Sequence, residues 1–162
     1  ATAFAYQYLK ERDVPCLIYQ GCYNLFYREP EESGVLQQTK ENGAGFISFS
    51  PLAQGLLTDR YLSGVPSDSR MAKDPRYLHS DMLTPQVYKR ISRLNDLAKQ
   101  RGEPLSSMAL GWILQNPKVT SVIVGASTPE QLSQNLSALH SPKFSDEECS
   151  MIDEILNINI VE

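Results

Sequence analysis

The sequence predicts an α/β fold with parallel strands. Three short apolar segments alternate with amphipathic helical patterns along the 162 residues. This alternation is typical of strand–helix–strand units, in which successive strands pair in parallel. Each apolar segment is followed by small or polar residues, so we expect a polar corner at the end of each strand.

The three expected strands are short. Residues 16–20 (Cys-Leu-Ile-Tyr-Gln) form the first, and Gln20 is its only strongly polar side chain. Residues 45–50 form the second, and residues 119–124 form the third, which stops at Gly125. Because β-branched and aromatic side chains suit a crowded pleated sheet, we expect the first and third strands to be buried.

Helical spacing of apolar residues marks the segments around these strands. It predicts helices over residues 1–12, 32–42, 84–101, 105–113, 128–139 and 145–156. Thr84 and Thr128 each precede a proline, which is typical of a capped helix start. After Thr128, Leu132, Leu136 and Leu139 recur at helical spacing and predict one apolar face.

Residues 51–83 are rich in Gly, Pro, Ser and charges, and we interpret them as a functional loop with one short helix, not as an interdomain linker. The pattern as a whole holds too little sheet for its helices, since three parallel strands would leave two unpaired edges. We therefore expect the chain to be the C-terminal part of a larger α/β barrel.

Composition excludes several classes of function. The net charge is −4 with acidic and basic residues interleaved, so we expect no nucleic-acid surface. No apolar run approaches the roughly 20 residues of a membrane helix and no signal-peptide pattern is present, so we expect a cytoplasmic protein without membrane insertion. Cys16, Cys22 and Cys149 fit no zinc motif, and we expect reduced thiols and no metal site.

The corner between the third strand and the next helix predicts a site for an anion. A strand that turns into a capped helix over Gly125 and Ser127 points backbone N–H groups and the positive end of a helix dipole at one spot, which suits a phosphate. Gln131, Gln134 and Asn135 add uncharged hydrogen-bonding groups on the first turns. For this segment alone, a capped helix with solvated amides is an equally open interpretation.

Three motifs, in order along the chain, resemble the aldo-keto reductases. They are Tyr19-Gln20-Gly21-Cys22-Tyr23-Asn24-Leu25 with Arg28, then Phe49-Ser50-Pro51-Leu52-Ala53-Gln54-Gly55-Leu56-Leu57, then Val124-Gly125-Ala126-Ser127 with Gln131 and Asn135. Within that family the chain looks most similar to potassium-channel β subunits and bacterial glyceraldehyde-phosphate reductases. The resemblance implies a (β/α)8 (TIM) barrel. Residues 1–162 would supply strands six to eight, their helices and the C-terminal helix of a domain whose N-terminal half is missing.

The resemblance also implies an oxidoreductase that uses NADP to reduce aldehydes or ketones to alcohols by hydride transfer. It assigns Gln20 to the nicotinamide carboxamide and Phe49 to the face of the nicotinamide ring. The loop residues that would approach the pyrophosphate are Ser50, Pro51, Leu52, Ala53, Gln54, Gly55 and Leu57, with Arg60 near the phosphates and Arg70 near the adenosine. The residues that would hold the adenine and its ribose phosphate are Gly125, Ser127, Gln131, Gln134 and Asn135.

Plainer interpretations of these side chains stay open. Gln20 can satisfy a loop backbone group, Phe49 can pack in a core, and an exposed Arg60 or Arg70 can simply be solvated. The preference for NADP over NAD comes from the resemblance and from arginines that could pair with a 2′-phosphate.

The family's catalytic Tyr, Lys, Asp and His come from the first half of the barrel, and no matching motif occurs here. We therefore expect no catalytic residue in this chain and no reductase activity from it in isolation. Two alternatives stay open: an NADP-binding regulatory subunit like the channel β subunits, or a fragment that binds nothing. The expected partner is a small carbonyl substrate, and the sequence is compatible with a homo-oligomer.

Overall fold

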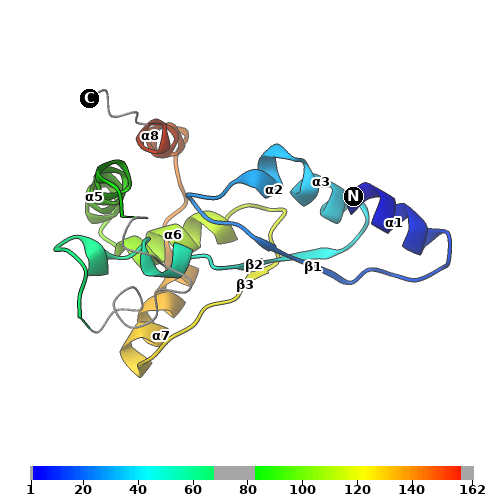
Figure 1. The fold of residues 1–162 in the computed structure, drawn as a ribbon, viewed down its shortest axis with the longest axis horizontal. Helices are drawn as coiled ribbons and strands as arrows, with labels where there is room; N and C mark the ends of the chain where they lie inside the picture. Colours follow the sequence, from blue (N-terminus) through cyan, green and yellow to red (C-terminus); the bar gives the residue numbers. More distant parts are fainter. Residues whose placement is uncertain (1, 68–82, 158–162) are drawn as a thin grey trace.

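A three-stranded parallel sheet forms the centre of the fold, as predicted. The computed structural model of the chain describes residues 2–67 and 83–157. In it, β1 (Ile18–Cys22) pairs with β2 (Gly45–Phe49), and β2 pairs with β3 (Ser121–Val122), all in parallel (Figure 1). Because the strands are parallel, the segments that follow them all begin at the same end of the sheet, the carboxyl end.

Helices account for most of the remaining regular structure. They are α1 (Thr2–Lys10), α2 (Glu29–Glu32), α3 (Val35–Glu41), α5 (Pro85–Gln100), α6 (Leu105–Leu114), α7 (Pro129–Leu136) and α8 (Asp146–Leu156), with the 3-10 turns η1 (Ala53–Gly55), η2 (Asp59–Tyr61) and η4 (Ser137–His140). The two predicted threonine caps are confirmed, since Thr84 and Thr128 each accept a hydrogen bond from a backbone N–H of the first turn. The single helix expected over residues 32–42 is instead α2 and α3, because Gly34 between them has a left-handed φ of 76°.

Helices α3 and α6 cover one face of the sheet. The buried Phe46 of β2 lies at its centre, with its ring stacked on Tyr19 at 5.7 Å and meeting Tyr23 edge-on at 6.2 Å. The side chains that pack around this aromatic group come from both helices and from β3: Val35, Leu36, Ile113 and Val122. These contacts form the smaller of two apolar clusters.

The opposite face of the sheet, which we call the open face, is largely uncovered. Strand alternation places Ile18, Gln20, Ile47, Phe49 and Ser121 on it. Ile18 is 56% exposed and Phe49 is 39% exposed. The prediction that the first and third strands are buried is therefore wrong, because both are edge strands of the described sheet and no described element covers this face.

The strand boundaries also differ from the prediction. β1 begins and ends two residues later than the expected 16–20, so Gln20 lies inside the strand and its side chain is exposed. β3 is only two residues long, against six expected, and Ile123 immediately after it is 48% exposed. The apolar run at residues 119–124 thus continues beyond the ladder hydrogen bonds into the corner before α7.

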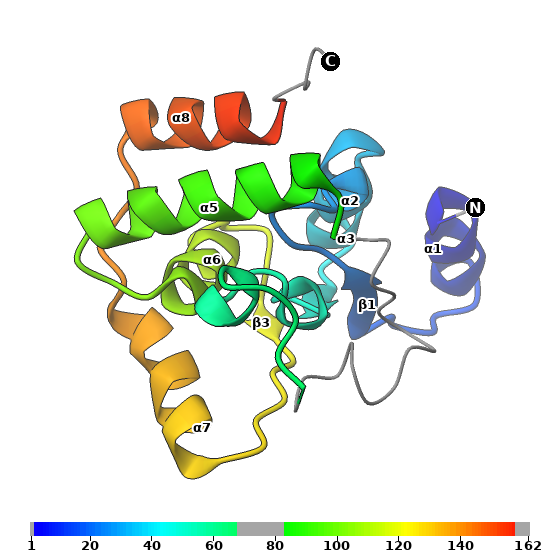
Figure 2. The ribbon, with the colours of Figure 1, turned by 60° about the vertical axis from the view of Figure 1, so that its left-hand side comes forward.

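The larger apolar cluster lies between α5, α6, α8 and the segment that follows β2. Figure 2 shows α5 and α8 side by side, with α6 beneath α5. The fully buried side chains of this cluster come from all four parts of the chain and include Leu57, Tyr61, Ile91, Leu94, Met108 and Ile152. This cluster fixes the segment after β2 against three helices.

The apolar face expected on α7 does not face the core. Leu132, Leu136 and Leu139 are 45%, 53% and 67% exposed. α7 and η4 instead pack on α6 through small and polar groups: the Ser107 hydroxyl donates to the Gln134 carbonyl at 3.0 Å. The side of α7 that meets α6 is therefore polar, and the leucine stripe lies on an exposed side.

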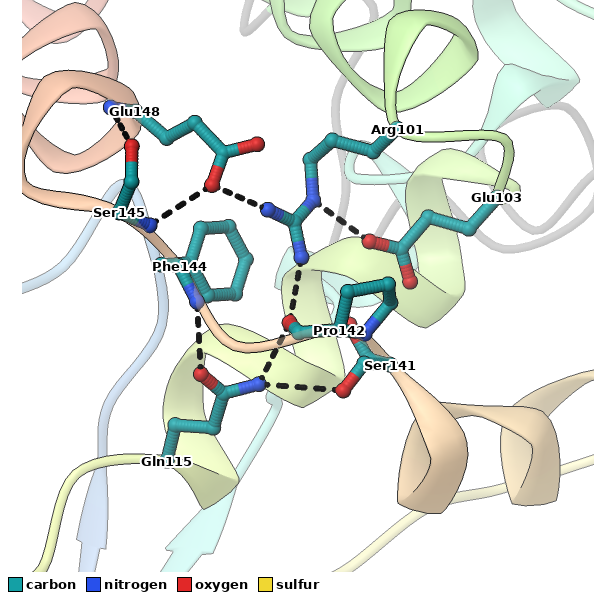
Figure 3. A network of polar contacts seen from close by, with 8 residues as sticks. All are labelled: Arg101, Glu103, Gln115, Ser141, Pro142, Phe144, Ser145 and Glu148. Carbon is teal, nitrogen blue, oxygen red and sulfur yellow. Dashed lines mark hydrogen bonds and ion pairs between the residues drawn. The ribbon is translucent and has the colours of Figure 1, made fainter.

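A buried arginine links the ends of α5 and α8 (Figure 3). The Arg101 guanidinium contacts the carboxylates of Glu103 at 2.7 Å and Glu148 at 2.5 Å, donates to the Pro142 carbonyl at 2.6 Å, and lies 3.8 Å above the Phe144 ring. Glu148 also completes a capping box with Ser145 at the start of α8.

Two kinds of structural feature are absent from the described ranges. None of their helices combines the length and apolarity needed to cross a membrane. Nor do the described residues group three His, Cys, Asp or Glu side chains that could hold a metal ion. The three cysteines are free thiols, and Cys16 and Cys22 are half-buried while Cys149 is exposed.

Candidate functional site

A cavity of about 1040 Å³ opens at the carboxyl end of the sheet. Its walls are the corner after β2, the corner between β3 and α7, and the 3-10 turn η2, with Ser106 of α6 among the lining residues. Small-molecule sites usually enclose about 300–1,000 Å³, so this cavity is large enough for a cofactor of several linked groups.

The wall that follows β2 has an unusual backbone. Ser50, Ala53 and Gln54 have positive φ values of 51°, 47° and 59°, and Gly55 has 101°. Each non-glycine residue in this region costs about 1–3 kcal/mol, so the surrounding structure must hold the corner in place. Two backbone hydrogen bonds help to hold it, from the Ala53 N–H to the Ser50 carbonyl at 2.9 Å and from the Leu57 N–H to the Leu52 carbonyl at 3.1 Å.

The wall between β3 and α7 is an ordered helix start. The Ser127 N–H donates to the Gln131 side-chain oxygen at 2.8 Å, and the Thr128 hydroxyl accepts from the Gln131 N–H at 3.3 Å. Because the Gln131 oxygen is engaged, its NH₂ group is the part available to a ligand. The positive end of the α7 dipole and the Gln131 NH₂ group favour a negatively charged group in the cavity.

The third wall carries the charged groups. Among the described lining residues, Asp59, Arg60 and Tyr61 are the ionisable ones, and Thr58 caps η2 by accepting a hydrogen bond from the Arg60 N–H at 3.2 Å. Arg60 gives the cavity one described cation. The Asp59 carboxylate and the Arg60 guanidinium thus give this wall one charge of each sign.

Most of the residues predicted to bind a cofactor lie together in this cavity. The predicted residues that line it are Ser50, Pro51, Leu52, Gln54, Gly55, Arg60, Gly125, Ser127, Gln131, Gln134 and Asn135. Two segments about 75 residues apart in the sequence thus meet at one place. The resemblance to the aldo-keto reductases had assigned both segments to one cofactor.

The remaining predicted residues lie elsewhere. Gln20 and Phe49 are on the open face, where the parallel register pairs Gln20 with Ile47 and Phe49 with Cys22. Ala53 is half-buried beside the cavity without lining it. Leu57 is fully buried in the larger apolar cluster, so its side chain is not accessible to a ligand. Arg70 lies outside the described residues.

The prediction missed several residues of the lining: Thr58, Asp59, Tyr61, Pro66, Ser106, Ile123, Val124 and Ala126. Ser106 is the most informative, because it comes from α6, whose other buried residues are mostly apolar. It is 5% exposed and adjoins Ser107, which hydrogen-bonds to α7. Two serines in an otherwise apolar helix were a signal that one of its sides meets polar groups.

The lining offers polar groups and open space to a ligand. The side-chain oxygen of Gln54 is buried and has no hydrogen-bond partner among the described residues, which leaves an acceptor for an amide or hydroxyl of a ligand. A Cβ at Gly125 would meet only open space, so the corner leaves room beside its backbone. Together with Arg60 and the helix start, these features offer both polar and cationic contacts.

Known proteins resemble this chain over nearly its whole length. The model of the aldo/keto reductase family matches residues 2–157. L-glyceraldehyde 3-phosphate reductase of Escherichia coli O157:H7 is 47% identical over 149 residues, which are 90% of this chain and 43% of that protein; the K12 protein is 46% identical over the same lengths. A putative voltage-gated potassium channel subunit beta of Schizosaccharomyces pombe is 35% identical over 147 residues, 88% of this chain and 43% of that protein.

The chain therefore spans less than half the length of these relatives. Both kinds of relative belong to the branch that the three sequence motifs indicated, and the family model covers all three motifs. The predicted resemblance is confirmed, and the parallel α/β sheet is consistent with part of the barrel that the family implies. This chain belongs to the aldo/keto reductase family.

Proposed function

We propose that the chain supplies strands six, seven and eight of a (β/α)8 barrel, with the helices that follow them, in an NADP-dependent aldo-keto reductase. The three strands are parallel and adjacent in chain order, as consecutive barrel strands are. The open face carries exposed Ile18 and Phe49, as expected of an inward barrel face without its remaining strands. The match to 43% of the relatives' length agrees in extent with a part of a barrel.

The cavity at the carboxyl end of the sheet is the observation that carries the proposed function. In the complete protein, the helix start at Ser127 and Gln131 binds the adenosine-side phosphate, and residues 50–55 present their backbone to the pyrophosphate. Gln20 and Phe49, on the open face beside this cavity, bind the nicotinamide carboxamide and stack on the ring. NADPH, when bound, supplies the hydride that reduces an aldehyde or ketone.

The residues of this chain bind and orient the cofactor and do not supply the proton. The described lining holds no carboxylate or histidine paired with a tyrosine or lysine in the arrangement that carbonyl reduction needs. We therefore expect the isolated chain to bind NADPH without reducing carbonyl compounds.

A regulatory role is the second candidate. The chain is 35% identical to a protein named as a putative voltage-gated potassium channel subunit beta. In this second proposal the cofactor would bind to regulate a partner, and its turnover would matter less. Copurification of the full-length protein with a membrane channel would favour this role. Carbonyl reduction by the full-length protein, without such a partner, would favour the reductase.

Fluorescence titration with NADPH tests the proposed site. We expect saturable binding to the purified chain, and about tenfold weaker binding to a Gln131→Glu variant, because the new carboxylate keeps the acceptor for Ser127 but repels a phosphate. The matched control is Gln100→Glu, the same change at an exposed position at the end of α5. A folded chain that binds no NADPH, or two variants that bind equally, would contradict the proposed site.

A further inference from the structure

Asn24 is a buried polar residue in the turn that follows β1, and it reaches the corner that follows β2. It is 3% exposed. Its side-chain oxygen accepts hydrogen bonds from the N–H groups of Phe26 at 2.9 Å and Tyr27 at 3.0 Å. Its NH₂ group donates to the Ser50 carbonyl at 2.9 Å. One amide therefore closes the turn after β1 and holds the first residue of the cavity wall after β2.

These contacts fix the orientation of the amide. The oxygen faces two backbone donors and the nitrogen faces a backbone carbonyl, so a flipped amide would bring like groups together at all three contacts. The buried Asn24 thus has a single hydrogen-bonding arrangement. A second hydrogen bond joins the turn after β1 to β2: the Ser48 hydroxyl donates to the Tyr23 carbonyl at 2.6 Å.

Ser50 needs such support because its backbone conformation is unfavourable for two reasons. Its φ of 51° lies in the left-handed region, which side chains other than glycine avoid. It also precedes Pro51, and the residue before a proline is driven toward extended conformations with negative φ. Two donors hold the Ser50 carbonyl, the Asn24 amide at 2.9 Å and the Ala53 N–H at 2.9 Å, so both of its lone pairs are engaged.

We propose that Asn24 is a positioning residue for the nucleotide: by holding the Ser50 carbonyl, it keeps residues 50–55 in the conformation that the phosphates of NADP require. This inference rests on the proposed function, and it adds a residue outside the cavity lining to the site. Without the amide donor, Ser50 can relax toward negative φ, and the backbone of the following residues turns away from the cavity.

Two substitutions separate the two hydrogen-bonding roles of the amide, which accepts within the turn and donates to Ser50. Asn24→Asp keeps the acceptors for Phe26 and Tyr27 but cannot donate from its carboxylate to the Ser50 carbonyl. Asn24→Ser is uncharged, can still accept in the turn, and is too short to reach Ser50. We expect both variants to bind NADPH about tenfold more weakly than the original chain, as measured by fluorescence titration.

Ser50→Gly tests the mechanism, because glycine adopts positive φ without strain. In a Ser50→Gly background, Asn24→Asp should weaken NADPH binding by less than about threefold, because the corner no longer depends on the amide. The two substitutions should also be coupled in their effect on the Tm, measured without nucleotide. We expect Asn24→Asp to lower the Tm less when residue 50 is glycine than when it is serine. This second readout does not depend on cofactor binding.

Asn42→Asp is the matched control. Asn42 also donates from its side chain to a backbone carbonyl, that of Gln38 at 2.8 Å, but at the exposed end of α3. It should leave NADPH binding unchanged. The positioning role would be overturned if Asn24→Asp weakened NADPH binding equally, and lowered the Tm equally, with serine and with glycine at residue 50. That result would leave the proposed cofactor site intact. A folded original chain that binds no NADPH would overturn the proposed function, and the nucleotide role of Asn24 with it.

Discussion

Arg101 and Glu148 lie 2.5 Å apart and join the end of α5 to the start of α8. The arginine side chain is only 3% exposed, and its other contacts are Glu103, the Pro142 carbonyl and the Phe144 ring. Helix α8 is thus attached to the rest of the chain by a buried charge as well as by apolar side chains such as Ile152. Loss of that charge should therefore affect the whole larger cluster.

Arg101→Ala should lower the free energy of unfolding by about 3–5 kcal/mol, because it leaves the buried Glu103 carboxylate without its partner. Urea denaturation followed by circular dichroism measures this change. Arg93→Ala, at an exposed position on the same helix, should change the free energy of unfolding by no more than about 0.5 kcal/mol. Equal effects of the two substitutions would show that the Arg101 network is not important for stability.

Acid should weaken the attachment of α8. Burial alone would raise the pKa of the Glu148 carboxyl, but the Ser145 backbone N–H and the Arg101 guanidinium lower this pKa below its ordinary value. The folded protein therefore binds this proton less readily than the unfolded chain. The resulting stability is present above the unfolded pKa of about 4.3 and is lost as the pH falls through that value toward the folded pKa.

Glu148→Gln should accordingly flatten the fall in the free energy of unfolding between about pH 5 and pH 3. Urea denaturation at a series of pH values measures the slope. A variant with the same slope as the original chain would mean that other carboxylates dominate the acid response.

Gly111→Ala should destabilise the contact between α6 and η4. A Cβ at position 111 would lie 2.6 Å from both Cβ and Oγ of Ser141, which is closer than real atoms approach. We expect a loss of about 1–3 kcal/mol, even though alanine favours helices more than glycine does. Ser141→Gly removes both obstructing atoms, so it should restore most of the loss in the double variant. An alanine at 111 that stabilises the chain would contradict this close packing.

Arg60→Ala should weaken NADPH binding about tenfold or more, since a hydrogen bond to a charged group contributes about 1.5–3 kcal/mol. The loss should shrink at high salt, because screening weakens the original contact. Titrations at low and high ionic strength measure both effects, with Arg93→Ala as the control for a change in net charge. Identical affinities for Arg60→Ala and the original chain would remove Arg60 from the site.

Local features of the fold could be predicted because local chemistry decides them. Thr84 and Thr128 cap helices as expected, and Gly102 has the left-handed φ of 72° that ends α5. The meeting of Ser50 and Ser127 was also predictable, because parallel strands send the segments after them to one edge of the sheet.

Features that depend on distant parts of the chain were not predictable. An apolar stripe such as Leu132 to Leu139 shows that a helix has an apolar face, but not whether another element covers it. The role of Asn24 depends on a carbonyl 26 residues away, and the amide looks like an ordinary turn former in the sequence. Leu57 was assigned to the cofactor because it is the last residue of the loop motif, but its side chain packs in the core.

The outer edge of β1 has a practical consequence for any solution study of this chain. Leu17 and Ile18 beside it are 75% and 56% exposed, and no described strand pairs with that side of β1. A free strand edge flanked by apolar side chains is a template for self-association. Concentrated samples are therefore expected to form oligomers or precipitate, and affinities should be measured in dilute protein and checked for dependence on protein concentration.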